Sequence, residues 1–488
     1  MPEMKFKYEK SVVDSFHDQV TVKYCGIQVS KIIEKGIRKL LLDGHLNGPS
    51  GKIDDLQRKV AECFSSALWL TRRRNSAPPW SPGDTLFVCH NETGFSGVSP
   101  LVKEMSAQKR ACAVILPEEG RNWSSLPPRH EGETWVFGAS FSEAPRSAEI
   151  KAIVRAFKKQ TSAFLLQHHL QNKVPIRSDL VAQAKHALTR IELIRSWIKR
   201  AEPGRIVVNQ PKEEPLYYSL AGRVEGVPTV IVPHGVLRGR DVFRPAFYDL
   251  GLFDVGVVRS YRCAVIAHSL NPSMRTIVTG FSGFGSTLAS GRDPGSEGAL
   301  DQPGQVLREG IFRVGMAADK DLQDVNEVAA AAARAGVMLF VKGRPPGRDG
   351  PLLQEAIGAH RGFKALPHEA ISLDEFLNSV AGIVCTRSNV AFHAAAQGVP
   401  VIYWRGVKAR QTSAGPRNAD SSDTPEGLAV EDVALESPRD VEELVETLSK
   451  WRADGAEALE RRRQKQIQCY ARWFPQYDPE VILRSMLS

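Results

Sequence analysis

The sequence predicts an α/β protein of two domains, each built on a parallel sheet, with an additional helical segment at the N-terminus. Three observations predict this class. Short apolar segments alternate with helical patterns in two separate series, which is typical of parallel sheets. The 488 residues exceed the roughly 250–300 at which a single hydrophobic core stops growing. Residues 282–305, rich in Gly, Ser, Asp and Pro, separate the two series.

The first series of apolar segments begins after a helical and irregular stretch at residues 1–80, in which apolar residues recur every three or four positions. Long helical patterns cover 147–171 and 179–200, and the Gly-containing stretch 91–100 predicts a turn. We predict strands at 85–90, 111–117, 134–140, 205–210, 228–235, 253–260 and 275–281.

The second series follows the Gly-rich stretch and ends in two helical patterns near 440–451 and 457–474. We predict its strands at 312–317, 337–343, 363–367, 382–388 and 399–404. The predicted organisation is an N-terminal helical segment (1–80), an N-terminal domain (81–285), a linker (286–305), a C-terminal domain (306–455) and a C-terminal helical segment (456–488) that packs back on the N-terminal domain.

The charge balance favours an anionic partner. Lys and Arg number 64 against 55 Asp and Glu, a net charge of +9, which suits a phosphate-bearing substrate, nucleic acid or an acidic membrane, or simply a solvated basic surface. Nucleic acid is not expected, because no nucleic-acid-binding motif is present. No apolar run approaches the roughly 20 residues of a membrane span, and seven cysteines without CxxC spacing favour a reducing, cytoplasmic location.

Two strand ends in the second series carry residues suited to phosphate. Strand 382–388 leads through Arg387 and Ser388 into a helix starting near Asn389, where free N–H groups and the helix dipole attract anions. Ser and Asn are equally common as plain N-caps, which is the structural alternative. Strand 337–343 ends in Lys342 and Gly343, and Arg344 follows it directly. The Lys342 and Arg344 side chains are cations that can bind phosphate.

This order of elements resembles the GT-B glycosyltransferases, which have two facing Rossmann-like domains, and particularly the bacterial sialyl- and Kdo-type transferases of capsule and lipopolysaccharide synthesis. The segment 342–345 is similar to their Lys/His-Pro element, with Arg in place of His. Ser388-Asn389 resembles their Ser-containing element, and VPHGV at 232–236 resembles their His-Gly element. The resemblance implies a transferase that moves a sugar from a nucleotide-sugar donor to a saccharide or glycolipid acceptor during surface polysaccharide assembly.

The sequence departs from that family at the nucleotide site. Many GT-B enzymes carry a ribose-binding Glu in the helix that begins near Asn389, whereas His393 is the polar residue well inside it here. A large group of retaining GT-B enzymes carries a Glu-x7-Glu pair, and residues 380–410 contain none. The resemblance therefore favours a transfer that inverts the configuration of the sugar. No Asp-x-Asp motif ends a predicted strand, so we expect no metal and no cofactor apart from the nucleotide-sugar co-substrate.

An inverting transfer needs a base that deprotonates the acceptor hydroxyl. The strand at 85–90 runs into His90 and Glu92, and we prefer Glu92 as the base over His90. His234, in the His-Gly element, is a third catalytic candidate. The structural alternatives are that Glu92 only caps a turn and that His234 is a lone structural histidine.

Other functions remain open on the sequence alone. A sugar-nucleotide epimerase or a glycerophosphate transferase would share the phosphate site but not the acceptor chemistry. The net positive charge is also compatible with a non-catalytic protein that binds a nucleotide or a polyanion. The basic residues at 460–465, followed by aromatic residues at 470–474, suit peripheral contact with the inner face of a membrane, although ordinary docking of a C-terminal helix explains them better.

Overall fold

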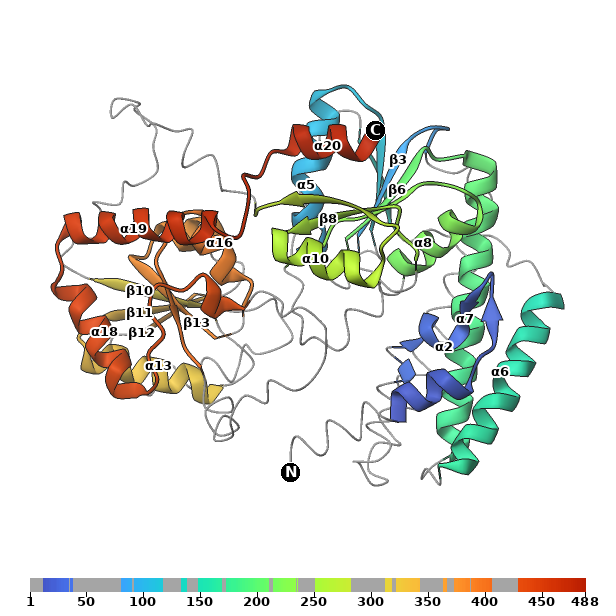
Figure 1. Cartoon of the computed structure of the whole chain (residues 1–488), viewed down its shortest axis with the longest axis horizontal. Helices are drawn as coiled ribbons and strands as arrows, with labels where there is room; N and C mark the ends of the chain where they lie inside the picture. Colours follow the sequence, from blue (N-terminus) through green and yellow to red (C-terminus); the bar gives the residue numbers. More distant parts are fainter. Residues whose placement is uncertain are drawn as a thin grey trace. The chain divides into compact units, whose positions relative to one another are not determined.

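The computed structural model describes residues 12–34, 36–37, 80–89, 92–116, 133–137, 148–168, 173–209, 214–233, 235, 251–281, 312–317, 322–342, 363–366, 373–386, 388–405 and 429–488. The chain divides into two compact units (Figure 1). The first contains the described residues up to 233 together with 251–255, and the second contains Gly235 and the described residues from 256 onwards.

A seven-stranded sheet has the strand order β5-β4-β3-β6-β7-β8-β9. Its strands are β3 (Thr85–Val88), β4 (Cys112–Leu116), β5 (Glu133–Phe137), β6 (Arg205–Val208), β7 (Thr229–Ile231), β8 (Val255–Arg259) and β9 (Arg275–Thr279). The pairs from β5 to β7 are parallel. Every strand predicted for the first series is therefore confirmed, each somewhat shorter than predicted.

Helices join these strands: α5 (Glu92–Ala107), α6 (Ala148–Gln167), α7 (Lys173–Ala201), α8 (Glu214–Val224) and α10 (Tyr261–Leu270). The turn predicted at 91–100 was wrong, because α5 begins at Glu92 and runs through Gly94 and Pro100. Gly94 is needed for packing: a Cβ there would lie 1.5 Å from the Asn209 Nδ2 atom. A glycine that permits a close helix contact was mistaken for a helix breaker.

The N-terminal segment packs on α6 and α7. It contains helical residues 12–19, an antiparallel pair of short strands, β1 (Lys23–Tyr24) and β2 (Ile27–Gln28), and α2 (Val29–Ile32). The Phe16 ring lies 4.8 Å from that of Phe164 in α6, and the Tyr24 hydroxyl hydrogen-bonds to Glu192 in α7. The prediction of helix is confirmed in part. The hairpin was missed because two-residue strands leave no alternating pattern.

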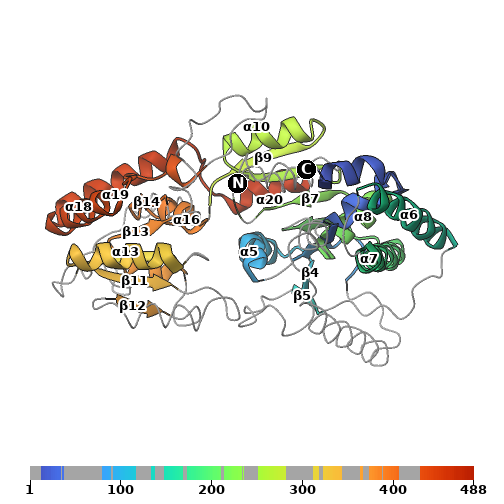
Figure 2. The same ribbon diagram turned by 90° about the horizontal axis from the view of Figure 1, so that it is seen from below.

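The second sheet has five parallel strands in the order β12-β11-β10-β13-β14 (Figures 1 and 2). They are β10 (Arg313–Ala317), β11 (Met338–Lys342), β12 (Phe363–Leu366), β13 (Gly382–Cys385) and β14 (Val401–Tyr403). The described helices are α13 (Leu322–Arg334), α15 (Leu373–Asn378), α16 (Val390–Ala396), the 3₁₀ turn η2 (Val430–Asp432), α18 (Val441–Ala453), α19 (Ala456–Ala471) and α20 (Pro479–Leu487). The strands predicted for the second series are confirmed.

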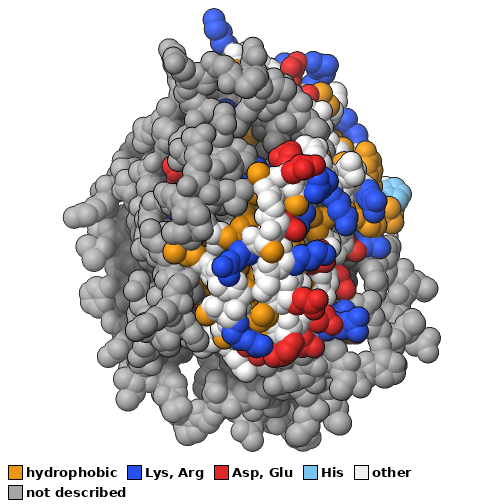
Figure 3. Space-filling view, turned by 90° about the vertical axis from the view of Figure 1, so that its left-hand side faces the viewer, with side chains coloured by type: hydrophobic (Ala, Val, Ile, Leu, Met, Phe, Trp, Pro, Cys, Tyr) orange, Lys and Arg blue, Asp and Glu red, His pale blue; other side chains and the backbone are white. Residues whose placement is uncertain are grey.

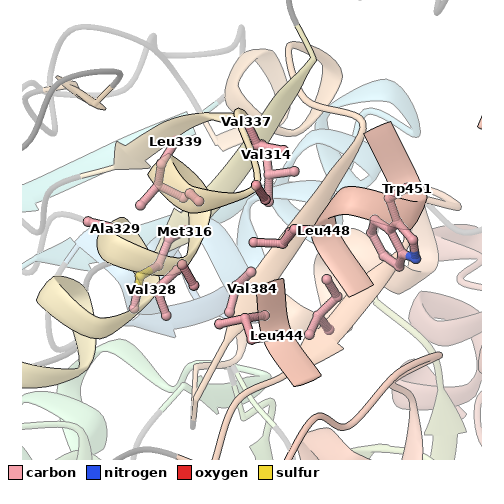
Figure 4. Close-up of a cluster of buried hydrophobic side chains, with 14 of the residues drawn as sticks. Val314, Met316, Val328, Ala329, Val337, Leu339, Val384, Leu444, Leu448 and Trp451 are labelled. Atoms are coloured by element: carbon pink, nitrogen blue, oxygen red, sulfur yellow. The ribbon is translucent and has the colours of Figure 1, made fainter. Parts of the chain in front are cut away.

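The core of this second sheet lies under α13 and α18. Figure 4 shows Val314 and Met316 of β10 facing Val328 of α13 and Leu448 of α18, with Trp451 closing one end. These side chains are buried, and burying each contributes roughly 1.5–3 kcal/mol. The packing fixes the central strands of this sheet against α13 and α18.

The C-terminal segment returns to the last strand of the seven-stranded sheet. The Arg275 guanidinium of β9 donates hydrogen bonds to the Ser485 carbonyl at 2.6 Å and to the Ser488 hydroxyl at 3.1 Å. The backbone N–H of Phe281 donates to the Tyr470 hydroxyl of α19 at 2.6 Å. Among the described residues, no helix is both long and apolar enough to cross a bilayer.

Candidate functional site

The carboxyl edge of the five-stranded sheet collects the predicted phosphate-binding residues. Lys342 pairs with Ala317 at the end of β10, and Met316 pairs with Val384 in β13 on the other side. Because these strands are parallel, Lys342 and Ser388 leave the sheet at the same edge with only β10 between them. Lys342 is level with Cys385, the last residue of β13, so two strand spacings place the backbones of these two residues roughly 9–10 Å apart. Ser388 follows shortly after Cys385 in the sequence.

Lys342 is a buried cation at this edge. It is the last residue of β11, after the apolar residues Met338–Val341, and it is only 8% exposed. An ammonium group removed from water is costly unless anionic or polar groups compensate it. Lys342 also ends a strand at the carboxyl edge of the sheet, which is the edge where ligands of open α/β sheets bind.

Ser388 begins the next element. Its Oγ atom accepts a hydrogen bond from the Val390 N–H at 3.3 Å, and Ser388 directly precedes the N-cap residue Asn389. The helix begins at Val390, one residue later than predicted, and the Asn389 side chain makes no capping bond. Gly398 follows the end of the helix with φ +72°, and the N–H of Val399 bonds back to the Ala394 carbonyl at 2.8 Å, as in a Schellman motif.

The His-Gly element meets the Ser-Asn element in space. Gly235 lies so close to Asn389 that a Cβ at Gly235 would be 2.3 Å from the Asn389 Nδ2 atom and 2.9 Å from its Cγ. Real Cβ contacts are never this short, so only glycine fits while the amide keeps its place. Two elements that the sequence marked separately are thus brought together within one unit.

A charged and aromatic cluster lies beside α16. The His393 ring is 4.7 Å from the Phe281 ring, and the Arg259 guanidinium lies 5.6 Å from the same ring. Arg259 is 5% exposed, and its Nη1 donates to the Gly280 carbonyl at 2.8 Å. Burial lowers the pKa of Arg259. Arg259 was not among the predicted site residues. A charged residue at the end of the apolar strand 255–259 could have indicated it.

The His393 imidazole is neutral in this setting. Burial lowers its pKa to about 4, with help from the Arg259 cation and against the opposing influence of Asp374. A neutral imidazole can donate one hydrogen bond and accept another. His393 therefore offers hydrogen-bonding capacity beside α16 and no positive charge.

This pKa predicts how stability depends on pH. An unfolded histidine titrates near 6.5, so between pH 6.5 and about 4 the unfolded chain binds a proton at His393 that the folded chain does not. Stability is therefore fully present above pH 6.5 and falls as the pH decreases through this window. From pH 7 to pH 5 we expect His393 to account for about 2 kcal/mol of lost stability.

Urea unfolding at both pH values measures this loss. His393→Asn should lose about 2 kcal/mol less than the wild type. His268→Asn is the matched control, because His268 is exposed on α10. An equal loss in the wild type and His393→Asn would show that His393 is not the titrating group.

The carboxyl edge of the first sheet holds the predicted base. Glu92 is the first residue of α5, directly after β3, and Asn209 follows the neighbouring strand β6, which pairs Val208 with Val88. Asn209 is buried against α5 at Gly94. The Glu92 backbone thus lies where the prediction placed it, at a strand end, but on a helix N-terminus instead of in a turn.

The remaining predicted site residues lie outside the described residues: His90, His234, Gly343, Arg344 and Arg387. Their roles stay predictions. Within the described ranges, no group of three or more His, Cys, Asp or Glu side chains is arranged to hold a metal ion.

Comparison with known proteins identifies the fold. No family model matches the chain, and no curated protein matches it in sequence. Among solved structures, the S. aureus MnaA–UDP complex is 13% identical over 82% of this chain and 95% of its own, with a TM-score of 0.50. The UDP-GlcNAc 2-epimerase from Neisseria meningitidis bound to UDP-GlcNAc is 12% identical over 83% and 99%, with a TM-score of 0.48. The glycotransferase of kitacinnamycin is 12% identical over 80% and 95%, with a TM-score of 0.44.

The chain therefore has the GT-B fold, an α/β class built on two parallel sheets. At these identities the likeness defines the fold and not the reaction. The predicted fold class is confirmed.

Proposed function

We propose that the chain is a glycosyltransferase that moves a sugar from a nucleotide-sugar donor to a saccharide or glycolipid acceptor, with inversion and without a metal ion, in the assembly of a surface polysaccharide. The second sheet holds the donor. Lys342 and the Ser388-Asn389 element bind the donor phosphates, and Glu92 on the first sheet deprotonates the acceptor.

One observation carries the proposal: Gly235 abuts Asn389 at the carboxyl edge of the second sheet. Ligands of open α/β sheets bind at this edge, and Lys342 ends a strand on it. The backbone at Gly235 approaches the start of α16 so closely that a Cβ there would displace the Asn389 amide. This arrangement supports a donor site assembled from three segments distant in the sequence.

The donor site is tested by thermal stabilisation. A ligand that binds only the folded state raises Tm by mass action. We propose UDP-sugars as the first donors to examine, because UDP is bound in the MnaA structure that shares this fold, with CMP-, GDP- and dTDP-sugars as comparisons. The shift should disappear when Ser388→Ala and Lys342→Ala are combined. No shift with any nucleotide sugar would contradict the proposal.

Gly235→Ala tests the observation itself. The added methyl group must displace the Asn389 amide, which would otherwise lie 2.3 Å from it. A misplacement of about 1 Å in a binding site costs on the order of a hundredfold in rate, so we expect kcat/KM for transfer to fall by about that factor. Gly455→Ala is the control, since nothing lies within 4 Å of a Cβ there.

A double variant shows whether the two elements act together. Asn389→Ala removes the group that the Gly235 methyl would hit, so Gly235→Ala with Asn389→Ala should be no worse than Asn389→Ala alone. Such non-additivity is expected of residues in contact. Losses that simply add would contradict a shared site.

Product analysis separates the proposal from other reactions of the fold. Conversion of the donor alone into an isomeric sugar nucleotide would identify an epimerase. Transfer of glycerophosphate to an acceptor would identify a glycerophosphate transferase. Binding without turnover would identify a nucleotide-binding protein.

A further inference from the structure

Helix α6 carries an exposed stripe of positive charge. Lys151, Arg155, Lys158 and Lys159 are all exposed, and at 100° per residue they fall within about 100° of one another around the helix. Leu166, which is 66% exposed, continues the same stripe at its C-terminal end. The one acidic residue of α6, Glu149, lies on a different face. We call these four cations and Leu166 the α6 stripe.

The stripe gathers four cations on one face of a single helix with no acidic residue among them. Lys151, Arg155 and Lys159 follow one another at four-residue spacing, an arrangement of like charges that destabilises a helix. Elsewhere this chain pairs such residues: Arg484 of α20 bonds to Glu480 at 2.7 Å, and Arg461 of α19 pairs with Glu457 four residues earlier. Among the described residues, no ion pair joins the stripe cations to an acid.

The opposite side of α6 is accounted for by packing. Phe157 and Phe164 are buried there, and Phe16 of the N-terminal segment contacts both phenyl rings. Figures 1 and 2 show α6 beside α7, away from the strands of the first sheet. The stripe is therefore the solvent-facing side of a firmly packed helix, and its charge pattern is not needed for that packing.

The basic residues at 460–465 and the aromatic residues at 470–474, near the C-terminus, are a poorer candidate for a docking surface. Tyr470 and Phe474 are buried, and the Trp473 ring lies under the Arg262 guanidinium at 4.9 Å. The aromatic residues predicted to suit a membrane thus face inward. Figure 3, which views the left-hand side of Figure 1, shows basic and acidic side chains intermixed among the described residues of that face.

We propose that the α6 stripe is a docking surface for an anionic lipid bilayer. Lys and Arg side chains attract acidic headgroups, and an exposed leucine in line with them can enter the headgroup region. A second copy of the chain fits poorly, because two stripes would repel each other and each chain carries a net charge of +9. The proposal does not depend on the reaction that the protein catalyses.

Co-sedimentation of the full chain with vesicles tests the proposal. The protein should bind phosphatidylcholine vesicles that contain phosphatidylglycerol, and it should not bind vesicles of phosphatidylcholine alone. The stripe variant combines Lys151→Gln, Arg155→Gln, Lys158→Gln and Lys159→Gln. Each cation contributes about fivefold (about 1 kcal/mol), so binding should weaken on the order of several hundred-fold.

A matched variant controls for net charge. Lys103→Gln, Arg110→Gln, Lys185→Gln and Lys465→Gln remove the same number of exposed cations from α5, the turn after it, α7 and α19. This control should retain most of the vesicle binding. Equal losses in the two variants would overturn the proposal by showing that total charge, and not the stripe, controls binding.

Two further results would overturn the proposal. One is that the wild type fails to bind the anionic vesicles. The other is tighter binding to heparin or to single-stranded DNA than to the vesicles, which would assign the stripe to a soluble polyanion. Leu166→Gln should weaken binding roughly tenfold (about 1.4 kcal/mol), as expected for an apolar group withdrawn from water, and unchanged binding would overturn the insertion of Leu166.

Discussion

Lys342→Met is expected to lower kcat/KM for sugar transfer on the order of a thousandfold and to remove the thermal stabilisation by nucleotide sugar. In the proposed reaction the departing nucleotide carries negative charge on its phosphate. A fixed cation that is buried at the site stabilises this charge far more than a solvated one would, and removing one such group costs on the order of 10²–10³-fold. Lys342, 8% exposed at the end of β11, meets this description.

The substitution separates binding from folding. Methionine is unbranched and flexible, so it can fill the space of the lysine carbon chain. We therefore expect the Tm without ligand to change little, while the shift produced by the donor is lost. Lys450→Met, at an exposed position of α18, is the control and should behave like the wild type. A donor-induced shift that persists in Lys342→Met would exclude Lys342 as a phosphate ligand.

Most of the fold could be predicted because the strands are short, apolar and separated by helices. Buried segments such as 382–385, which is flanked by turns, leave a clear pattern in the sequence. The failure was local: the first part of α5, up to residue 100, was predicted to be a turn because its glycines are typical of turns. The reason for Gly94 is the Asn209 side chain packed against it, and that residue comes more than a hundred positions later.

The site could be predicted only as separate elements. The sequence marked the His-Gly and Ser-Asn elements by their position after strands. It could not show that Gly235 abuts Asn389, because that contact depends on how distant segments pack. For the same reason His393 was read as a polar residue in a helix, whereas its neutral state follows from burial and from Arg259.

Glu92→Gln is expected to abolish transfer while leaving donor binding intact. Removing a general base typically costs 10²–10⁴-fold, and we expect a loss on the order of a thousandfold in kcat. Glutamine keeps the size of the side chain but accepts no proton at neutral pH. The Tm shift caused by the nucleotide sugar should be unchanged, because the donor is proposed to bind the second sheet and not the first.

The position of Glu92 requires a control for helix stability. Glu92 is the first residue of α5, and removing a carboxylate from the first turn of a helix generally costs about 0.3–1 kcal/mol through the helix dipole. Glu104→Gln makes the same substitution in the last turns of the same helix, where Glu104 accepts a hydrogen bond from Gln108 at 2.8 Å. Transfer at the wild-type rate in Glu104→Gln would show that exchanging a carboxylate of α5 for an amide does not by itself lower the rate, and would assign the effect to position 92.

The outcome also decides between the catalytic candidates. If Glu92→Gln transfers sugar at the wild-type rate, the base is another group, and His90 and His234 are the next residues to replace. His234 directly precedes Gly235, whose contact with Asn389 fixes the chain at the edge of the second sheet. Loss of both donor binding and transfer in a His234 variant would assign His234 to the donor, whereas loss of transfer alone would assign it to proton removal.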